Sequence, residues 1–357
     1  MRLEPPRWWY AGRLPLAAWG LLPISAAYGL LVRRRFRTAA PYESKLPVLC
    51  VGNFTIGGAG KTPVALTLAS MLKDAGRNPA FLTRGYGGYE RGPHRARPAV
   101  DAAARVGDEP LLLAREAATV VSRDRPAGAR LIEKLPADVI VMDDGFQNPS
   151  LRKDFNLIVI DAGAGTGSGR VFPLGPLRAP LGFQAGMADA ILIVGTDGDG
   201  AGKRVTGKVN LALQEARSRS RTRGERYFSQ GVNVFQARIA PRVTEEMRSR
   251  PFVAFCGIGR PAKFFDTLEA AGIAVVKTHS FPDHHIYTER EAVALLAEAN
   301  AMHAGLITTE KDLVRLTGAA GTLAELRRAS IALPIWIEFS GEDGELLLKA
   351  ILAHLPS

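Results

Sequence analysis

The hydrophobic positions along the chain predict buried strands that alternate with helices. Short apolar runs, each of strand length and bounded by turn residues, recur through most of the sequence. They lie at residues 47–53, 78–85, 137–144, 155–162, 188–196, 252–259, 273–281, 305–310 and 331–339. Residues 61–75, between the first two runs, predict a helix. This alternation is typical of βαβ units, so we expect an α/β fold with a mostly parallel sheet and flanking helices.

An uncharged segment, residues 14–32 (LPLAAWGLLPISAAYGLLV), precedes the first predicted strand. Its length is close to the roughly 20 residues that cross a bilayer as a helix, although Pro15 and Pro23 interrupt it. Arginines flank it on both sides, and aromatic residues typical of membrane interfaces accompany it, namely Trp8, Trp9, Tyr10 and Trp19. We therefore predict a membrane-associated helix within residues 1–37, which either spans the bilayer or lies in its interface. The alternatives are a buried helix of a soluble protein and a cleaved signal peptide, which the nucleotide-binding loop close behind disfavours.

A polar, basic stretch at about 197–250 interrupts the alternation and contains the run RSRSRTRGER. Such a run is either a solvated surface or a contact for phosphate or phospholipid groups. Because the alternation resumes after it, we predict two α/β domains behind the N-terminal helix. The first, residues 38–200, carries the nucleotide loop, and the second, residues 201–357, closes over the nucleotide.

Composition narrows the class of partner. The chain has 357 residues, of which 46% are hydrophobic and 23% charged, as in an ordinary globular protein. Its formal net charge of +11 favours an anionic partner such as nucleic acid, an anionic membrane surface or a phosphorylated substrate. No recognition module supports nucleic acid. Cys50 and Cys256 lie in separate apolar runs, which predicts core packing in a reducing compartment rather than a disulfide or a zinc site.

The sequence VGNFTIGGAGKTP, residues 51–63, joins a predicted strand to a predicted helix through a glycine-rich turn. This is the context of a P-loop, in which backbone N–H groups and a helix N-terminus surround phosphate oxygens. Lys61 is expected to contact the β- and γ-phosphates, and Thr62 to bind Mg²⁺. The predicted nucleotide-binding residues are Thr55, Ile56, Gly57, Gly58, Ala59, Gly60, Lys61 and Thr62.

The head of this loop departs from the standard G-x-x-x-x-G-K-[ST] pattern, since Thr55 stands where the first glycine is expected. The ending GGAGKT is similar to that of signalling and partitioning ATPases, whose loop carries a signature lysine. That lysine would fall at Ile56, which argues against this class.

Carboxylates at the ends of predicted elements are candidate metal ligands or proton acceptors. The run VIVMDDGFQN ends a strand with Asp143 and Asp144, and in P-loop proteins such an aspartate holds Mg²⁺. In an extended strand the two would face opposite sides, one toward the metal and one toward the substrate. Asp108 and Glu109 precede helix-like sequence, where helix capping is the structural alternative.

The run FPDHH, residues 281–285, places Asp283 beside His284 and His285 after a predicted strand. A carboxylate coupled to a histidine is a plausible device for accepting the proton of a hydroxyl group. An Asp-His sequence in a loop is also often a simple turn, so the residues of this run leave both interpretations open.

Together these motifs resemble the tetraacyldisaccharide 4'-kinases, the lipid A 4'-kinases of Gram-negative bacteria. The resemblance covers roughly residues 47–315, and its motifs occur in family order. They are VGNFTIGGAGKTP (51–63), LTRGYGG (82–88), VGDEPLLLA (106–114), DDGFQ (143–147), FPLGPLRAP (172–180), FCGIGRPAKFF (255–265), FPDHH (281–285) and TTEKD (308–312). The N-terminal hydrophobic segment and Thr55 at the head of the loop also fit this family. One departure is Ala179, where many relatives have glutamate.

The resemblance implies ATP-dependent transfer of a γ-phosphoryl group, with Mg²⁺ as cofactor, to the 4'-hydroxyl of a tetraacylated glucosamine disaccharide 1-phosphate, which forms lipid IVA. It implies an enzyme anchored or peripheral on the cytoplasmic face of the inner membrane, with inner-membrane lipids as partners and no nucleic acid. Carried over by motif, Asp108 resembles the catalytic base, with His284 as its partner, while Lys61 keeps its P-loop role. The implied metal-binding set is Thr62, Glu109, Asp143 and Asp144. Arg84 is implied to meet a phosphate of the substrate.

Two other interpretations compete with this one. The first is a membrane-associated regulatory P-loop NTPase without a lipid acceptor, whose turnover would not require a glycolipid. The second is a membrane-bound scaffold with a relict nucleotide site, whose mark would be decay of the acidic positions. The four residues on which this test rests are all present, namely Lys61, Thr62, Asp143 and Asp144.

Overall fold

The computed structural model describes residues 5–10, 14–58, 60–195 and 232–355, together with residues 205, 207, 211 and 214. The predicted basic run RSRSRTRGER and Ala59 lie outside these residues. The chain forms two compact units that are interleaved along the sequence. The first unit consists of Met1–Pro79, Glu133–Ile239 and Ile337–Ser357, and the second of Ala80–Ile132 and Ala240–Trp336. The bounds of these units differ from the predicted division of the chain at residue 200. The hydrophobic pattern of a strand does not show which sheet the strand joins.

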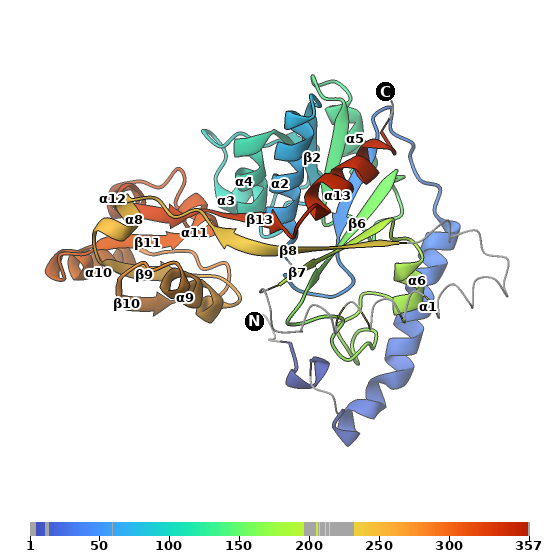
Figure 1. The fold of residues 1–357 in the computed structure, drawn as a ribbon, viewed down its shortest axis with the longest axis horizontal. Coiled ribbons are helices and arrows are strands. Elements are labelled where there is room, and N and C mark those ends of the chain that lie inside the picture. The colour runs from blue at the N-terminus through green and yellow to red at the C-terminus, as the bar shows by residue number, and fades with distance from the viewer. Residues whose placement is uncertain are drawn as a thin grey trace. The chain divides into compact units, whose positions relative to one another are not determined.

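The first unit is built on a parallel sheet (Figure 1). Its strands lie in the order β8-β7-β6-β1-β5, and each neighbouring pair is parallel. The strands are β1 (Val48–Gly52), β5 (Val139–Asp143), β6 (Phe155–Asp161), β7 (Ala190–Val194) and β8 (Asn233–Pro241), with β13 (Ile335–Phe339) beside β8. Every residue of β1, β5 and β7 is buried, as expected of parallel strands that are covered on both faces. This confirms the predicted mostly parallel α/β fold.

Helix α2 (Lys61–Asp74) follows β1 directly and covers this sheet. Its buried residues recur at helical spacing on one side, and they are Thr62, Val64, Ala65, Leu68, Ala69 and Leu72. Helix α13 (Asp343–Leu352) lies beside it, and α6 (Leu181–Ala185) precedes β7. The order strand, glycine loop, helix is therefore the one that the motif at residues 51–63 predicts.

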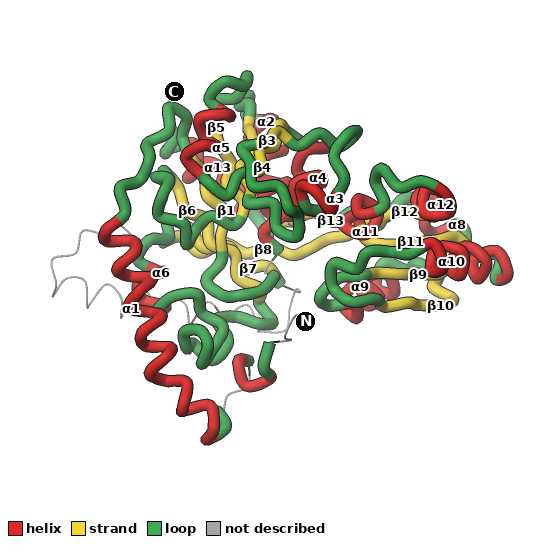
Figure 2. Tube along the Cα trace, turned by 180° about the vertical axis from the view of Figure 1, so that it is seen from behind, coloured by secondary structure: helices red, strands yellow, loops and turns green. Residues whose placement is uncertain are grey.

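The N-terminal segment is helical and packs on a loop of the first unit. It consists of η1 (Arg7–Trp9), η2 (Leu16–Leu21) and α1 (Leu22–Thr38). The hydroxyl of Ser25 donates to the carbonyl of Val171 at 2.7 Å, and the ring of Phe36 meets that of Phe183 edge to face at 5.5 Å. Figure 2 shows α1 running beside α6, as these contacts require.

The other side of this segment is apolar and exposed. Its exposed large side chains are Leu16, Trp19, Leu22, Ile24, Leu30 and Leu31. The continuous helix Leu16–Thr38 is long and apolar enough to cross a membrane, with a mean hydropathy of 1.4 in its most apolar window and 17% of that window buried. A contiguous exposed apolar surface of this kind is typical of a membrane or protein contact. Length and composition alone do not choose between spanning the bilayer and lying on it.

The second unit contains a parallel four-stranded sheet with helices on both faces (Figure 1). Its strands lie in the order β10-β9-β11-β12. They are β9 (Phe252–Cys256), β10 (Val275–Ser280), β11 (Gly305–Thr309) and β12 (Ser330–Leu333). Helices α8 (Glu246–Ser249) and α9 (Pro261–Ala270) pack on one face, and α10 (Glu289–Ala301) and α12 (Gly321–Ala329) on the other. The sides alternate along β9, since Ala254 faces α9 whereas Phe255 faces α10.

Residues 80–132 belong to the same unit. They form β2 (Pro79–Thr83), β3 (His94–Arg95), β4 (Ala118–Val121), α3 (Ala103–Val106), α4 (Asp108–Glu116) and α5 (Arg125–Ile132). Helix α11 (Glu310–Arg315) packs on α4, where Val314 shares a buried cluster with Leu111 and Leu112. This packing brings the VGDEP motif and the TTEKD motif together.

The sequence missed or merged a few strands. The apolar run 331–339 is two strands, β12 and β13, which separate at Pro334 because proline cannot donate a ladder hydrogen bond. Strand β8 lies in the polar stretch where no strand was expected, and only two of its nine residues are buried. Strands β3 and β4 are short, which weakens their hydrophobic pattern.

Candidate active site

The nucleotide loop of the first unit has the backbone that a phosphate cradle needs. Gly57 and Gly60 have positive φ values of 115° and 79°, which favour glycine. Asn53 Nδ2 donates to the carbonyl of Gly57 at 3.1 Å, and α2 begins directly afterwards at Lys61. The N-terminus of this helix therefore points its free N–H groups at the loop, which favours an anion there.

The head of the loop is held by another segment rather than by a glycine turn. Thr55 forms an isolated antiparallel bridge with Leu177, and the backbone N–H of Ile56 donates to the carbonyl of Pro176 at 2.8 Å. Both partners belong to the motif FPLGPLRAP. A residue paired like a strand has no need of positive φ, which explains why threonine serves at the position of the usual first glycine.

Thr62 and Asp143 form the candidate metal site of the first unit. Thr62 lies in the first turn of α2, Asp143 ends β5, and β5 is the parallel neighbour of β1. Thr62 Oγ1 lies 3.5 Å from Asp143 Oδ2, and both side chains are buried. A hydroxyl and a carboxylate are the hard oxygen donors that Mg²⁺ prefers, so these two residues fit the predicted ion.

Asp144 has different partners from Asp143. Its φ is 51°, so the backbone leaves the extended conformation there and the strand pattern of opposite faces ends at Asp143. Its carboxylate contacts Arg178 Nη1 at 3.0 Å and Lys61 Nζ at 3.6 Å. Arg178 Nε also donates to the carbonyl of Thr55 at 2.9 Å. Arg178 is thus a site residue that we did not predict, although its motif was visible in the sequence.

In the second unit, Asp108 and His284 are in direct contact. Asp108 is the first residue of α4, and His284 Nδ1 lies 3.2 Å from its Oδ2. The same oxygen accepts hydrogen bonds from Arg315 Nε at 3.0 Å and Nη2 at 2.5 Å. Burial raises the pKa of Asp108, but the hydrogen bond from His284 and the charges of Arg315 and Lys311 outweigh it and hold this pKa well below its usual range. Asp108 is therefore a fixed anion at neutral pH.

His284 is constrained on several sides. Its φ is 57°, an uncommon value for a residue with a side chain. Its backbone N–H donates to the carbonyl of Gly257 at 3.0 Å, and its ring meets that of Tyr86 edge to face at 5.5 Å. Nε2, the nitrogen that does not face Asp108, lies 3.8 Å from Asp283 Oδ2. The His284 side chain as a whole is 19% exposed.

Glu109 and Arg84 are the two remaining predicted site residues. Glu109 Oε1 lies 2.6 Å from Lys311 Nζ. Burial lowers the pKa of Lys311, but the charges of Glu109 and Asp108 outweigh it and raise this pKa. The predicted metal ligand is thus neutralised by an ammonium group in this structure. Arg84 follows β2 and is exposed.

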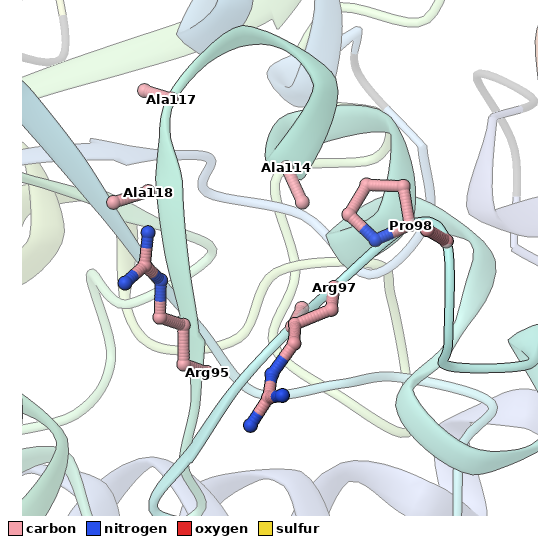
Figure 3. Close-up of a pocket in the computed structure, with 8 residues that line it drawn as sticks. Arg95, Arg97, Pro98, Ala114, Ala117 and Ala118 are labelled. Atoms are coloured by element: carbon pink, nitrogen blue, oxygen red, sulfur yellow. The ribbon is translucent and has the colours of Figure 1, made fainter.

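A shallow hollow elsewhere in the second unit is separate from these residues. It is lined by alanines of α4 and β4 and by the segment from Arg95 to Ala99 (Figure 3). None of the predicted site residues lines it, so it adds nothing to the candidate site.

Comparisons with known proteins decide the family. The family model described as LpxK, tetraacyldisaccharide-1-P 4'-kinase, matches residues 17–354. The chain belongs to this family. It is 47% identical to the tetraacyldisaccharide 4'-kinase of Methylobacterium sp. (strain 4-46), over 99% of this chain and 98% of that protein. It is 46% identical to the protein of the same name from Parvibaculum lavamentivorans, over 93% of each chain.

A solved structure agrees with this placement. The chain is similar to a crystal structure of LpxK from Aquifex aeolicus in complex with ATP, with a TM-score of 0.70 and 26% identity. The match covers 96% of this chain and 100% of that one. The predicted family, the kinase activity and the α/β fold are thereby confirmed. The roles of individual site residues stay predictions.

Proposed function

We propose that this kinase transfers the γ-phosphoryl group of ATP to the 4'-hydroxyl of tetraacyldisaccharide 1-phosphate, forming lipid IVA in lipid A biosynthesis. Family membership supports the activity and the acceptor class. The observation that supports the acceptor side of the reaction is the 3.2 Å contact between Asp108 Oδ2 and His284 Nδ1. A hydroxyl acceptor loses its proton during phosphoryl transfer, and a histidine paired with a carboxylate can accept that proton.

The first unit would bind the donor. Backbone N–H groups of the loop and the N-terminus of α2 would hold the phosphates. Lys61, whose contact with Asp144 is long, would turn to the β- and γ-phosphates and stabilise the charge that develops during transfer. Thr62 and Asp143 would hold Mg²⁺, which neutralises phosphate charge when bound.

The second unit would supply the base, but the roles that we assign to Asp108 and His284 differ from those predicted from the sequence. Family resemblance implies Asp108 as the base, but its depressed pKa and its bonds to Arg315 make it a poor proton acceptor. We infer that His284 accepts the proton and that Asp108 orients it. A hydrogen on Nδ1, donated to Asp108, leaves the lone pair of His284 Nε2 for the 4'-hydroxyl.

The proposed step balances as follows. The 4'-oxygen forms a bond to the γ-phosphorus while the bond from that phosphorus to the β,γ-bridging oxygen breaks. The hydroxyl proton moves to His284 Nε2, and ADP leaves with the bridging oxygen. The imidazolium formed is stabilised by the negative charge of Asp108, which itself stays ionised. That a C-terminal domain of residues 201–357 closes over the nucleotide stays a prediction.

We further propose that the N-terminal segment docks the enzyme on the cytoplasmic face of the inner membrane. Its exposed apolar side is followed by four arginines between residues 33 and 37. Apolar surface next to basic residues favours an anionic bilayer surface, where the acyl chains of the substrate lie. Inner-membrane lipids are therefore the expected partners, and no nucleic acid is expected.

The deciding experiment measures transfer from γ-labelled ATP to purified disaccharide 1-phosphate in mixed micelles. We expect labelled lipid to appear, and ATP turnover to require the glycolipid. ATP turnover of equal rate without the glycolipid would instead support the regulatory NTPase. Omission of Mg²⁺ should abolish phosphoryl transfer, and adding Mg²⁺ back should restore it.

A further inference from the structure

The Arg315 side chain donates hydrogen bonds to three different groups of the second unit. It ends α11, and its side chain is 8% exposed. Nε and Nη2 both donate to Asp108 Oδ2, while Nη1 donates to Asp312 Oδ1 at 2.7 Å and to the carbonyl of Gly257 at 2.6 Å. One guanidinium therefore joins a carboxylate of α4, a carboxylate of α11 and a backbone carbonyl after β9.

The carbonyl of Gly257 links Arg315 to the second member of the pair. It also accepts the backbone N–H of His284 at 3.0 Å, and His284 holds its left-handed φ of 57° there. Such a conformation persists when surrounding contacts enforce it. Arg315 thus contacts Asp108 through its carboxylate and, through Gly257, the backbone that sets the place of His284.

Asp312 keeps Arg315 in place. It is fully buried and accepts hydrogen bonds from Tyr287 Oη at 2.9 Å and from the backbone N–H of Gly257 at 3.0 Å. Its other oxygen contacts Thr309 Oγ1, the N-cap of α11. Because Asp312 is anchored by three groups, the guanidinium that it binds has one orientation.

We infer that Arg315 is a positioning residue, which fixes the carboxylate of Asp108 and the backbone of His284 so that the imidazole meets the acceptor hydroxyl. The inference rests on the proposed function. Arg315 acts through Asp108 and the carbonyl of Gly257, which it contacts directly. A lysine offers one point charge in place of a planar fork, so it cannot hold Asp108, Asp312 and Gly257 together.

A double-mutant cycle tests the inference. Arg315→Met and Asp108→Asn are each expected to lower kcat by roughly 10²-fold at saturating ATP and glycolipid, with KM for ATP changed less than about twofold. The variant carrying both changes should lose little more than Asp108→Asn alone, since Arg315 acts through Asp108. A general loss of packing would instead multiply the two effects and shift both kinetic parameters.

Two further variants complete the test. Arg315→Lys keeps the charge and should still lose roughly 10-fold in kcat, and it decides the matter if Arg315→Met does not fold. Arg250→Met is the matched control, because Arg250 also pairs with a carboxylate of this unit, Glu246, at 3.0 Å. This control variant should keep kcat within about twofold of the parent and should leave the melting temperature unchanged.

Multiplicative losses in the cycle, or a folded Arg315→Lys enzyme with the parental kcat, would overturn the inference. These results are distinct from failure of the proposed function. In that case the parental enzyme itself would not label the glycolipid, whereas failure of the inference alone leaves the parental transfer intact.

Discussion

Asp144 of the first unit and Asp108 of the second unit each contact an arginine, but they differ in burial, and the difference separates an adaptable contact from a fixed one. Asp144 of the first unit is 40% exposed and shares its carboxylate between Arg178 and Lys61. Asp108 of the second unit is 2% exposed, and two nitrogens of Arg315 bind one of its oxygens. Exposed ion pairs contribute little and exchange easily, whereas breaking a buried pair leaves an uncompensated charge.

This contrast suits the two tasks. In the proposed mechanism Lys61 leaves Asp144 when nucleotide phosphates arrive, and the long, partly solvated contact of 3.6 Å costs little to break. In the same proposal Asp108 stays in one position throughout the reaction, so that His284 keeps one orientation. We therefore expect the Lys61 charge of the first unit to move to a ligand and the Asp108 charge of the second unit to stay in place.

The largest loss of activity is expected when the ammonium group of Lys61 is removed. Lys61→Ala should lower kcat by roughly 10³-fold or more, because Lys61 stabilises transferring charge rather than the core. The fold should be intact by circular dichroism. Lys134→Ala, an exposed lysine of the same unit, is the matched control and should transfer phosphate normally. Near-normal turnover by folded Lys61→Ala protein would remove the P-loop assignment.

The next effect concerns the pair in the second unit. Asp108→Ala and His284→Ala should each lower kcat by roughly 10²-fold, with the affinity for ATP little changed. The double variant should be much less impaired than the product of the two losses, because residues that act as a unit are non-additive. Rates of all four proteins at saturating substrates decide this. A His284→Ala enzyme with normal kcat would exclude this histidine from the mechanism.

Stability separates the two aspartates directly. At pH 7, Asp108→Asn should lower the free energy of unfolding by about 3 kcal/mol, since Arg315 is left with an uncompensated buried charge. Asp144→Asn, at the exposed site, should change it by less than about 1 kcal/mol. Urea denaturation of both variants and the parent measures these differences. Equal destabilisation would contradict the contrast between fixed and adaptable contacts.

The same pair predicts a dependence on pH. The folded-state pKa of Asp108 is depressed, so its stabilising contribution is present above the unfolded value of about 4 and is lost as pH falls toward the folded value. The gap between the parent and Asp108→Asn should therefore narrow below about pH 4. Urea midpoints at pH 7 and pH 3 test this, and a gap that widens in acid would contradict the assignment of a depressed pKa.

The smallest effect on kcat is expected from changes in the N-terminal segment, which contributes to neither the Asp144 contacts nor the Asp108 contacts. Deleting residues 1–37 should move the protein toward the soluble fraction and weaken use of micellar substrate, with binding of ATP unchanged. Because α1 also packs on the 170–183 loop, Ile24→Glu with Leu31→Glu is the sharper variant, since both side chains lie on the exposed side. Full retention on membranes by the truncated protein would point to other surfaces, with the basic run 217–226 as the next candidate.

The sequence predicted the parts of the fold whose signals are local. The strand, glycine turn and helix at residues 48–74 were readable because hydrophobic spacing and glycine placement act over a few residues. The aspartates at the end of β5 were found for the same reason. Strand β8 was missed, because most of its residues are not buried and its alternation is weak.

Motif resemblance went further than local pattern, since it named Asp108 and His284 before their contact was known. It did not name Arg178 or Arg315 as site residues. Arg178 lies in the visible motif FPLGPLRAP and Arg315 lies outside the motifs, but the importance of each arginine comes from the groups that it joins.

By itself, the sequence determined the family, the α/β class, the nucleotide loop and an apolar N-terminal helix. Each of these follows from the pattern of neighbouring residues or from the order of the motifs. Only the tertiary structure decided that residues 80–132 join 240–336 in one unit, and that Arg315 holds both Asp108 and the carbonyl that anchors His284. The physical reason is that such contacts depend on the packing of α4 against α11, between segments far apart along the chain. The hydrogen bond from His284 and the charges of Arg315 and Lys311 then keep Asp108 ionised despite its burial, and this is why we propose that the histidine, rather than the aspartate, accepts the proton.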